Sequence, residues 1–201
     1  MKPVLNVTSK ETPRQILAKD FGLLEAELPI SGGWGYSKED ACIIDKNDST
    51  VNASLSFNGV AIEYIFVEKR IYEEMIIFRP AGKKYSGIKW KLRMQYLIRD
   101  ADRTFDKLVF EVTAFNDNDW DELKAEFEGD QGYNSPSFDE QAHKIKRQEK
   151  MVLLTREFWF DITSFYGQEL AVANRTTSKI KLFPALAIEF TKRLKKLLRI
   201  V

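Results

Sequence analysis

The stretch IKWKLRMQYLIR, residues Ile88–Arg99, gives the clearest strand signal in the chain, because an apolar side chain occupies every second position. Successive side chains of a β-strand point to opposite faces, so this period of two predicts a strand with one face in a core. The apolar series on that face is Ile88, Trp90, Leu92, Met94, Tyr96 and Ile98. The outward face would then carry four basic residues, Lys89, Lys91, Arg93 and Arg99.

The chain after this strand predicts a second strand, two helices and a third strand. Residues 105–115 and most of 151–164 are rich in β-branched and aromatic side chains, which favour strands. Between them, residues 120–128 have good helical propensity. Ser137 opens a capping-box pattern, which predicts a helix from there to Lys150.

The chain before this strand predicts a β-hairpin and one more strand. Asn58-Gly59 lies between the apolar runs 51–57 and 60–67. This dipeptide is typical of a two-residue hairpin turn, because both turn positions favour positive φ. Residues 71–78 are predicted as a further strand.

Helices are predicted at both ends of the chain. Thr12 and Gln15 form a capping box, which predicts a helix that begins there. Residues 168–181 are a further predicted strand, and residues 184–200 form a basic amphipathic helix with one apolar stripe. The sequence therefore predicts a single α+β domain, residues 1–201. Its mainly antiparallel sheet of about 6–8 strands would be packed by N-terminal, central and C-terminal helices.

The composition excludes several classes of protein. With 201 residues, 44% of them hydrophobic, the chain is long enough for a core without disulfide or metal staples. A single cysteine, Cys42, and a single histidine, His143, exclude a disulfide framework and metal sites made of several such residues. No cofactor and no metal site is predicted. No apolar run has the length of a secretion signal or a membrane span, so a cytoplasmic location is expected.

Charge is distributed unevenly along the chain, although the net charge is +1. Residues 116–140 contain nine acidic residues and one basic residue, a net charge of −8. Residues 141–201 contain thirteen basic and five acidic residues, a net charge of +8. Such segments either recruit partners of opposite charge or face each other within the fold, and the sequence leaves both open.

The leading functional hypothesis is a non-enzymatic intracellular protein-binding module that offers its acidic segment to a basic protein partner. A glycine-rich run with Trp34 and Tyr36 is a second candidate contact, as a flexible aromatic loop. Self-association through the C-terminal helix, residues 184–200, is also open. The acidic candidates are Asp117, Asp119, Asp121, Glu122, Glu126 and Glu128.

Two other functions remain as alternatives. The first is nucleic-acid binding by the basic face of the 88–99 strand, with Trp90 and Tyr96 expected on the opposite face. The second is a metal-dependent phosphoryl hydrolase that uses Asp119, Glu122 and a lysine. The two binding hypotheses differ in which charged patch must stay unpaired in the fold. An unpaired acidic segment favours protein binding, and an unpaired basic strand face favours nucleic-acid binding.

Two smaller expectations concern the acidic segment and the helix after it. The carboxylates from Asp117 to Glu128 have the spacing of a calcium-binding loop, but Glu122 stands where that loop requires glycine. An acid-rich first turn of a helix is therefore preferred to a calcium site. His143 lies among basic residues and is expected to face solvent.

Overall fold

The structure is a computed structural model, and it describes residues 6, 9–21, 28–51, 57–129, 135–136 and 138–167. The chain forms two compact units, residues 1–166 and 167–201. All the helices and strands described below belong to the first unit. The predicted strand 168–181 and the predicted C-terminal helix 184–200 lie outside the described residues.

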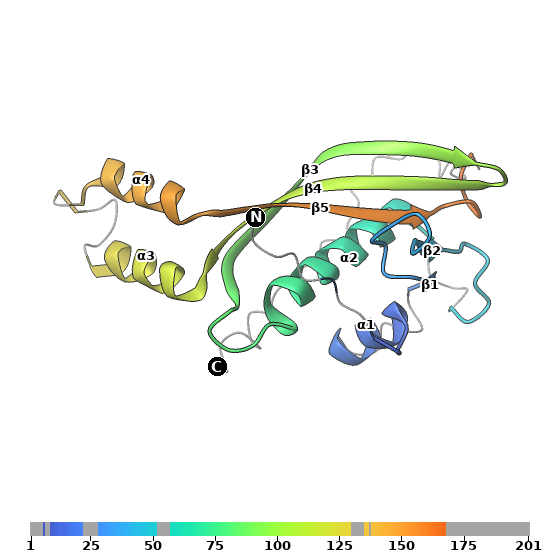
Figure 1. Cartoon of the computed structure of the whole chain (residues 1–201), viewed down its shortest axis with the longest axis horizontal. Helices are drawn as coiled ribbons and strands as arrows, with labels where there is room; N and C mark the ends of the chain where they lie inside the picture. Colours follow the sequence, from blue (N-terminus) through green and yellow to red (C-terminus); the bar gives the residue numbers. More distant parts are fainter. Residues whose placement is uncertain are drawn as a thin grey trace, which may run out of the picture. The chain divides into compact units, whose positions relative to one another are not determined.

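The described elements build an α+β fold around one open sheet of five strands, mostly antiparallel (Figure 1). The order across the sheet is β1-β2-β5-β4-β3, and only the β2–β5 pair is parallel. The α+β class and the mainly antiparallel sheet are therefore confirmed, whereas the strands in the described part are fewer than predicted. The strands are β1 (Ile30–Gly32), β2 (Cys42–Ile44), β3 (Tyr85–Asp100), β4 (Arg103–Asn116) and β5 (Val152–Asp161).

Helix α2 packs against one face of this sheet, which we call the inner face (Figure 1). Phe66 of α2 meets Phe160 of β5 edge to face, with ring centroids 5.5 Å apart, and Tyr64 meets Phe110 of β4 at 5.9 Å. The opposite face of β3, β4 and β5 is the outer face. The helices are α1 (Pro13–Phe21), α2 (Gly59–Tyr72), α3 (Asp117–Gly129) and α4 (Glu140–Lys150), and a π-helix, η1 (Glu73–Ile77), continues α2.

The predicted hairpin at Asn58-Gly59 is wrong, because Asn58 caps a helix. Its side-chain oxygen accepts a hydrogen bond from the Ala61 N–H at 3.1 Å, which satisfies a donor that the first helical turn leaves unpaired. The predicted strands 60–67 and 71–78 are accordingly helical, in α2 and η1. Their β-branched and aromatic residues favour strands locally, but burial against the sheet overrides that preference.

The long strand predicted at 88–99 is confirmed, but its alternation is broken by a β-bulge. Leu92 pairs with Phe110, and the next paired residue, Met94, faces Val109, so Arg93 is the extra residue. One inserted residue moves every later side chain to the other face. Met94, Tyr96 and Ile98 therefore lie on the outer face and not in the core as predicted.

Several local predictions are confirmed at single residues. The capping box of α1 is present, since the Thr12 N–H donates to Gln15 Oε1 at 2.9 Å and the Gln15 N–H donates to Thr12 Oγ1 at 3.3 Å. Helix α4 ends at Lys150 as predicted, but it begins at Glu140, two residues later than a cap at Ser137 implies. Its cap is Asp139, which accepts from the Ala142 N–H at 2.8 Å. Within the described residues, no helix has both the length and the apolar character that crossing a membrane requires.

Candidate functional site

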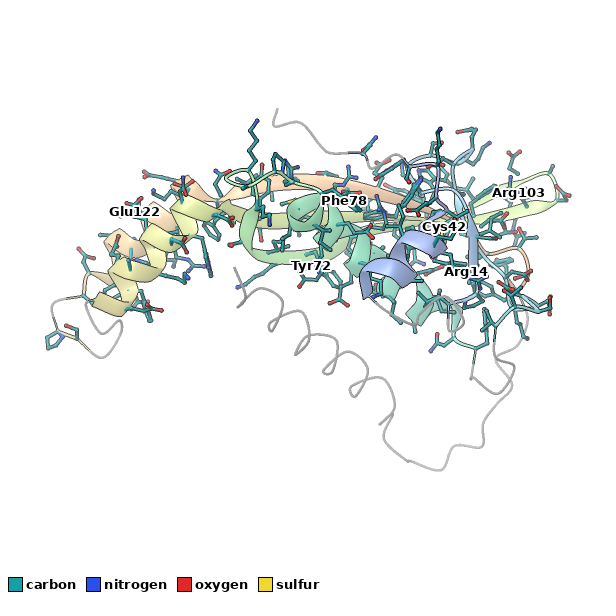
Figure 2. The ribbon with its side chains drawn as sticks, turned by 90° about the horizontal axis from the view of Figure 1, so that it is seen from below. Arg14, Cys42, Tyr72, Phe78, Arg103 and Glu122 are labelled. Carbon is teal, nitrogen blue, oxygen red and sulfur yellow. The ribbon has the colours of Figure 1, made fainter. Side chains whose placement is uncertain are left out.

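Helices α3 and α4, which come between β4 and β5 in the chain, lie side by side (Figure 1). Their facing sides carry opposite charges. Glu122, labelled on α3 in Figure 2, contacts Lys146 Nζ at 2.8 Å and Lys150 Nζ at 2.5 Å. Lys146 also donates to Glu126 at 2.5 Å, and Lys150 donates to Asp119 at 2.9 Å. Three of the acidic candidates are thus paired within the fold.

The pKa values of these groups shift in the directions that ion pairing requires. Hydrogen bonds from Lys146 are the largest cause of the lowered pKa values of Glu122 and Glu126. The same contacts raise the pKa of Lys146, and Glu122 together with Asp119 raises that of Lys150. The acidic side of α3 that faces α4 is therefore neutralised by the basic segment that follows it.

His143 does not face solvent, contrary to the expectation from its basic neighbours. It is buried on α4, and its ring lies 5.2 Å from that of Phe138 and 6.0 Å from that of Phe127. Its Nδ1 atom lies 3.0 Å from Glu126 Oε1. His143 is thus part of the packing that holds α3 against α4.

The other acidic candidates have separate surroundings. Asp117 begins α3 and accepts a hydrogen bond from Ser86 at 2.7 Å. Asp121 contacts Lys124 of the same helix at 3.2 Å and is largely exposed, and Glu128 is exposed near the end of α3. Because residues 117–128 form a helix, they do not form a calcium-binding loop.

The other side of α4 forms a groove with the outer face of the sheet. Residues 146 and 150 of α4 turn to α3, whereas residues 140, 144, 147 and 148 face the start of β3. His143 lies between these two sets, since it contacts Glu126 of α3 and also lines the groove. These two sets differ because residues three and four apart share one side of a helix. The groove is lined by Gly87, Lys89, Thr113, Phe115, Glu140, His143, Lys144, Arg147, Gln148 and Met151.

The shape of the groove at its β3 side depends on Gly87. This residue has a φ of +60°, and the Trp120 ring lies 2.6 Å from where a β-carbon would be. Glycine alone combines that backbone conformation with so close a ring. Trp120 stacks at 5.3 Å on Phe115, and the Arg147 guanidinium lies over both rings, at 5.3 and 5.7 Å. These two rings thereby hold the guanidinium of Arg147, which lines the groove.

The groove is basic, and its lysines are unpaired in the described part of the chain. Lys89 and Lys144 make no ion pair with any described residue, and Glu140 is the one acidic residue among those that line the groove. Lys91, the next outer-face residue of β3, also lacks an ion pair within the described ranges. Four positive charges, those of Lys89, Lys91, Lys144 and Arg147, therefore lie along one surface. We call this set the basic strip.

The bulge separates the four basic residues that the sequence places on one strand face. Lys89 and Lys91 lie on the outer face, where the strand register places them opposite Thr113 and Glu111 of β4. Arg93, at the bulge, contacts both carboxylate oxygens of Glu111 at 2.6 Å. Arg99 pairs with Thr104, which puts it on the inner face, and it donates to the Tyr166 hydroxyl at 2.9 Å.

Trp34 and Tyr36 belong to a buried cluster of charges beneath α2 and η1. The guanidinium of Arg70 lies 4.4 Å from the ring centre of buried Trp34 and donates to the Tyr36 hydroxyl. That hydroxyl donates to Glu74 at 3.0 Å, and Glu74 also contacts Arg156 at 2.6 Å. The structure thus uses these aromatic side chains in internal contacts, with Trp34 buried and Tyr36 half-buried.

Within the described ranges, no three histidine, cysteine, aspartate or glutamate side chains are placed to hold a metal ion. The carboxylates of the hydrolase hypothesis, Asp119 and Glu122, instead contact lysines of α4. Cys42 is fully buried, and burial raises the pKa of its thiol, so it is not a reactive nucleophile. No family model, no curated protein and no solved structure matches the chain.

Two residues of the groove, Lys144 and Arg147, were missed as candidates by sequence reasoning. The signal that finds them is helical spacing. The helical period of 3.6 residues places the basic residues Lys146 and Lys150 on one side of α4, and Lys144 and Arg147 on another. A single net charge counted over residues 141–201 hides this division.

Proposed function

We propose that this protein is a nucleic-acid-binding protein that holds a phosphate backbone in the groove between α4 and the outer face of the sheet. The observation that carries the proposal is the contrast between the two charged surfaces. The acidic residues of α3 that face α4 have lysine partners, whereas Lys89, Lys91 and Lys144 have no acidic partner in the described part. Unpaired lysines along a strip are what phosphate binding requires.

The chemistry of the groove supports the same proposal. Phosphate contacts are made by lysine, arginine and amide side chains, all of which line this groove as Lys144, Arg147 and Gln148. Arg147 is oriented by two aromatic rings, which lowers the entropy that it loses on contact with a ligand. A cytoplasmic location, as the sequence predicts, is part of this proposal.

The test compares substitutions that change the net charge equally on different surfaces. Lys89→Ala and Lys144→Ala should each weaken binding of a fluorescent oligonucleotide on the order of tenfold at low salt. Arg99→Ala removes the same charge from the inner face and should leave the affinity within about twofold. Fluorescence anisotropy measures all three, and thermal melting checks that each variant is folded. The proposal fails if the wild type does not bind, or if Arg99→Ala weakens binding as much as Lys89→Ala.

A second candidate function is protein binding through the outward side of α3. It is supported by Asp121 and Glu128, which point away from the α4 lysines and stay exposed. A basic partner would contact these residues and not the paired Glu122 and Glu126. The double charge reversal Asp121→Lys with Glu128→Lys should then abolish binding of polylysine at low salt, whereas unchanged binding contradicts this candidate.

A further inference from the structure

The outer face of the sheet combines the basic strip with exposed aromatic and apolar side chains beyond it. The register aligns Tyr96 of β3, Lys107 of β4 and Trp159 of β5 in one row across the three strands. The Lys107 ammonium lies 5.8 Å from the ring centre of Tyr96 and 5.1 Å from that of Trp159. Glu157 contacts the same ammonium at 2.8 Å. This row of aromatic rings is oriented by a paired lysine.

Large apolar side chains of the outer face are left exposed, Met94 and Tyr96 at this row and Leu153 near the groove. Met94 is 49% exposed, Tyr96 is 43% exposed and Leu153 is 58% exposed, and the register puts all three on the outer face. Tyr96 also donates its hydroxyl hydrogen to Met94 Sδ at 2.9 Å, which ties the two side chains together. Exposed apolar groups gathered on one face beside unpaired cations indicate a binding surface.

We propose that this outer face binds single-stranded nucleic acid, with phosphates on the basic strip and a base stacked on Tyr96. The inference rests on the nucleic-acid-binding function proposed above and adds the class of nucleic acid. A phosphate strip alone does not distinguish a duplex from a single strand. An exposed aromatic ring distinguishes the two, because the face of a base is available for stacking only when the base has left the duplex.

The bulge at Arg93 makes this arrangement possible. Without the extra residue, Tyr96 and Met94 would point to the inner face, as the alternation in the sequence predicts. With it, Lys89, Lys91 and Tyr96 share one face. Lys89 and Tyr96 lie opposite Thr113 and Lys107, which are six residues apart on β4, so at about 3.3 Å per residue they are about 20 Å apart along the strand. A stacked strand rises about 3.4 Å per nucleotide, so this distance corresponds to about six nucleotides.

The aromatic contact is tested with Tyr96→Ala. Its affinity for oligo-dT and oligo-U of about 12 nucleotides should fall about 5- to 100-fold, the loss that removing one stacked base produces. Tyr96→Phe keeps the ring and should bind within about twofold of the wild type. Leu97→Ala is the matched control, because Leu97 is the next residue, is 49% exposed and lies on the inner face.

The same titrations with a hairpin duplex separate this inference from the proposed function. Tyr96→Ala should leave duplex binding unchanged, while Lys89→Ala weakens the binding of both ligands. If Tyr96→Ala binds single strands as the wild type does while Lys89→Ala is weakened, the inference is overturned and the proposed function stands. If the wild type binds neither ligand, both are overturned. A difference between oligo-U and oligo-dT would show which of the two chemistries is preferred.

Discussion

Arg70 is the largest fully buried side chain in the described part of the molecule, and its charge is balanced entirely by internal groups. Its guanidinium donates to Glu73, Glu74 and Tyr36, while Nε makes no hydrogen bond within the described residues. Burying a guanidinium is costly unless carboxylates surround it, so removing one partner is more damaging than the pair is stabilising.

Glu74 is the residue on which this cluster depends, because it contacts Arg70, Arg156 and Tyr36. Glu74→Gln leaves two buried guanidinium groups with too little negative charge. We expect the free energy of unfolding to fall by about 3–5 kcal/mol, measured by urea denaturation. Glu157→Gln is the control, since the exposed Glu157–Lys107 pair should contribute about 1 kcal/mol or less. Equal losses in the two variants would contradict this account.

The ionisation of the Glu63 carboxyl should make the stability of the fold depend on pH. Burial, with a smaller contribution from Asp106, raises the pKa of Glu63 to about 8 from its ordinary value of 4.5. Between these values the folded state binds a proton that the unfolded state releases, so the free energy of unfolding falls as the pH rises through this range. Glu63→Gln should remove this part of the decrease, as measured by urea denaturation between about pH 5 and 8. An unchanged pH dependence in the variant would disprove the assignment.

At the scale of elements, the β3 bulge decides which side chains stabilise the sheet. Before it, Leu92 packs against the core that α2 forms with β4 and β5, whereas after it Met94 is exposed on the outer face. The sequence treats these two residues as equivalent members of one apolar series. The bulge therefore gives them different energetic roles.

Alanine substitution distinguishes those roles. Leu92→Ala should lower the free energy of unfolding by about 2 kcal/mol, the low end for such truncations, because this partly buried side chain packs against the core. Met94→Ala should cost less than about 1 kcal/mol, as substitutions on the surface usually do. Chemical denaturation of both variants provides the comparison. Similar large losses would mean that the alternation continues unbroken and that Arg93 is not the extra residue.

Helix α2 shows why some elements could not be predicted from local sequence. The run around residues 60–67 is apolar, and a short apolar run fits a buried strand and a buried helix equally well. Asn58-Gly59 is likewise ambiguous, because asparagine is favoured in hairpin turns and also at the start of helices. The helix is preferred because one of its sides buries Ile62, Phe66 and Ile71 against the sheet.

At the scale of the molecule, the near-zero net charge hides two very different environments. The 31 basic and 30 acidic residues give a net charge of +1, so long-range attraction of an anion to the whole chain is weak. Binding should then depend on the local field of the basic strip, which acts within a Debye length of about 8 Å at physiological salt.

The salt dependence of binding measures how many cations take part. Contacts from the four residues of the basic strip predict a slope of log K against log salt of about −3 for a single strand. Lys91→Ala should reduce the magnitude of that slope by about 0.7, and Arg99→Ala should leave it unchanged. Anisotropy titrations over a range of NaCl concentrations give the slopes. A slope near zero for the wild type would exclude phosphate contacts as the basis of binding.

The elements whose signals are local could be predicted from the sequence alone. Strands β3, β4 and β5 follow from alternation and composition, α1 from its capping box, and the opposed charges of α3 and α4 from simple counting. These features depend on residues within a few positions of one another, which is the range of strand periodicity and helix capping. The α+β class follows from them.

The pairing of the charges and the face that each side chain occupies depend on contacts that exist only in the folded chain. The pairing of Glu122 with Lys146 and Lys150 requires α3 and α4 to come together. The outer-face position of Tyr96 requires a bulge that is defined by the partner strand. Both depend on register and on contacts between distant segments, and these are not encoded in any local pattern of residues.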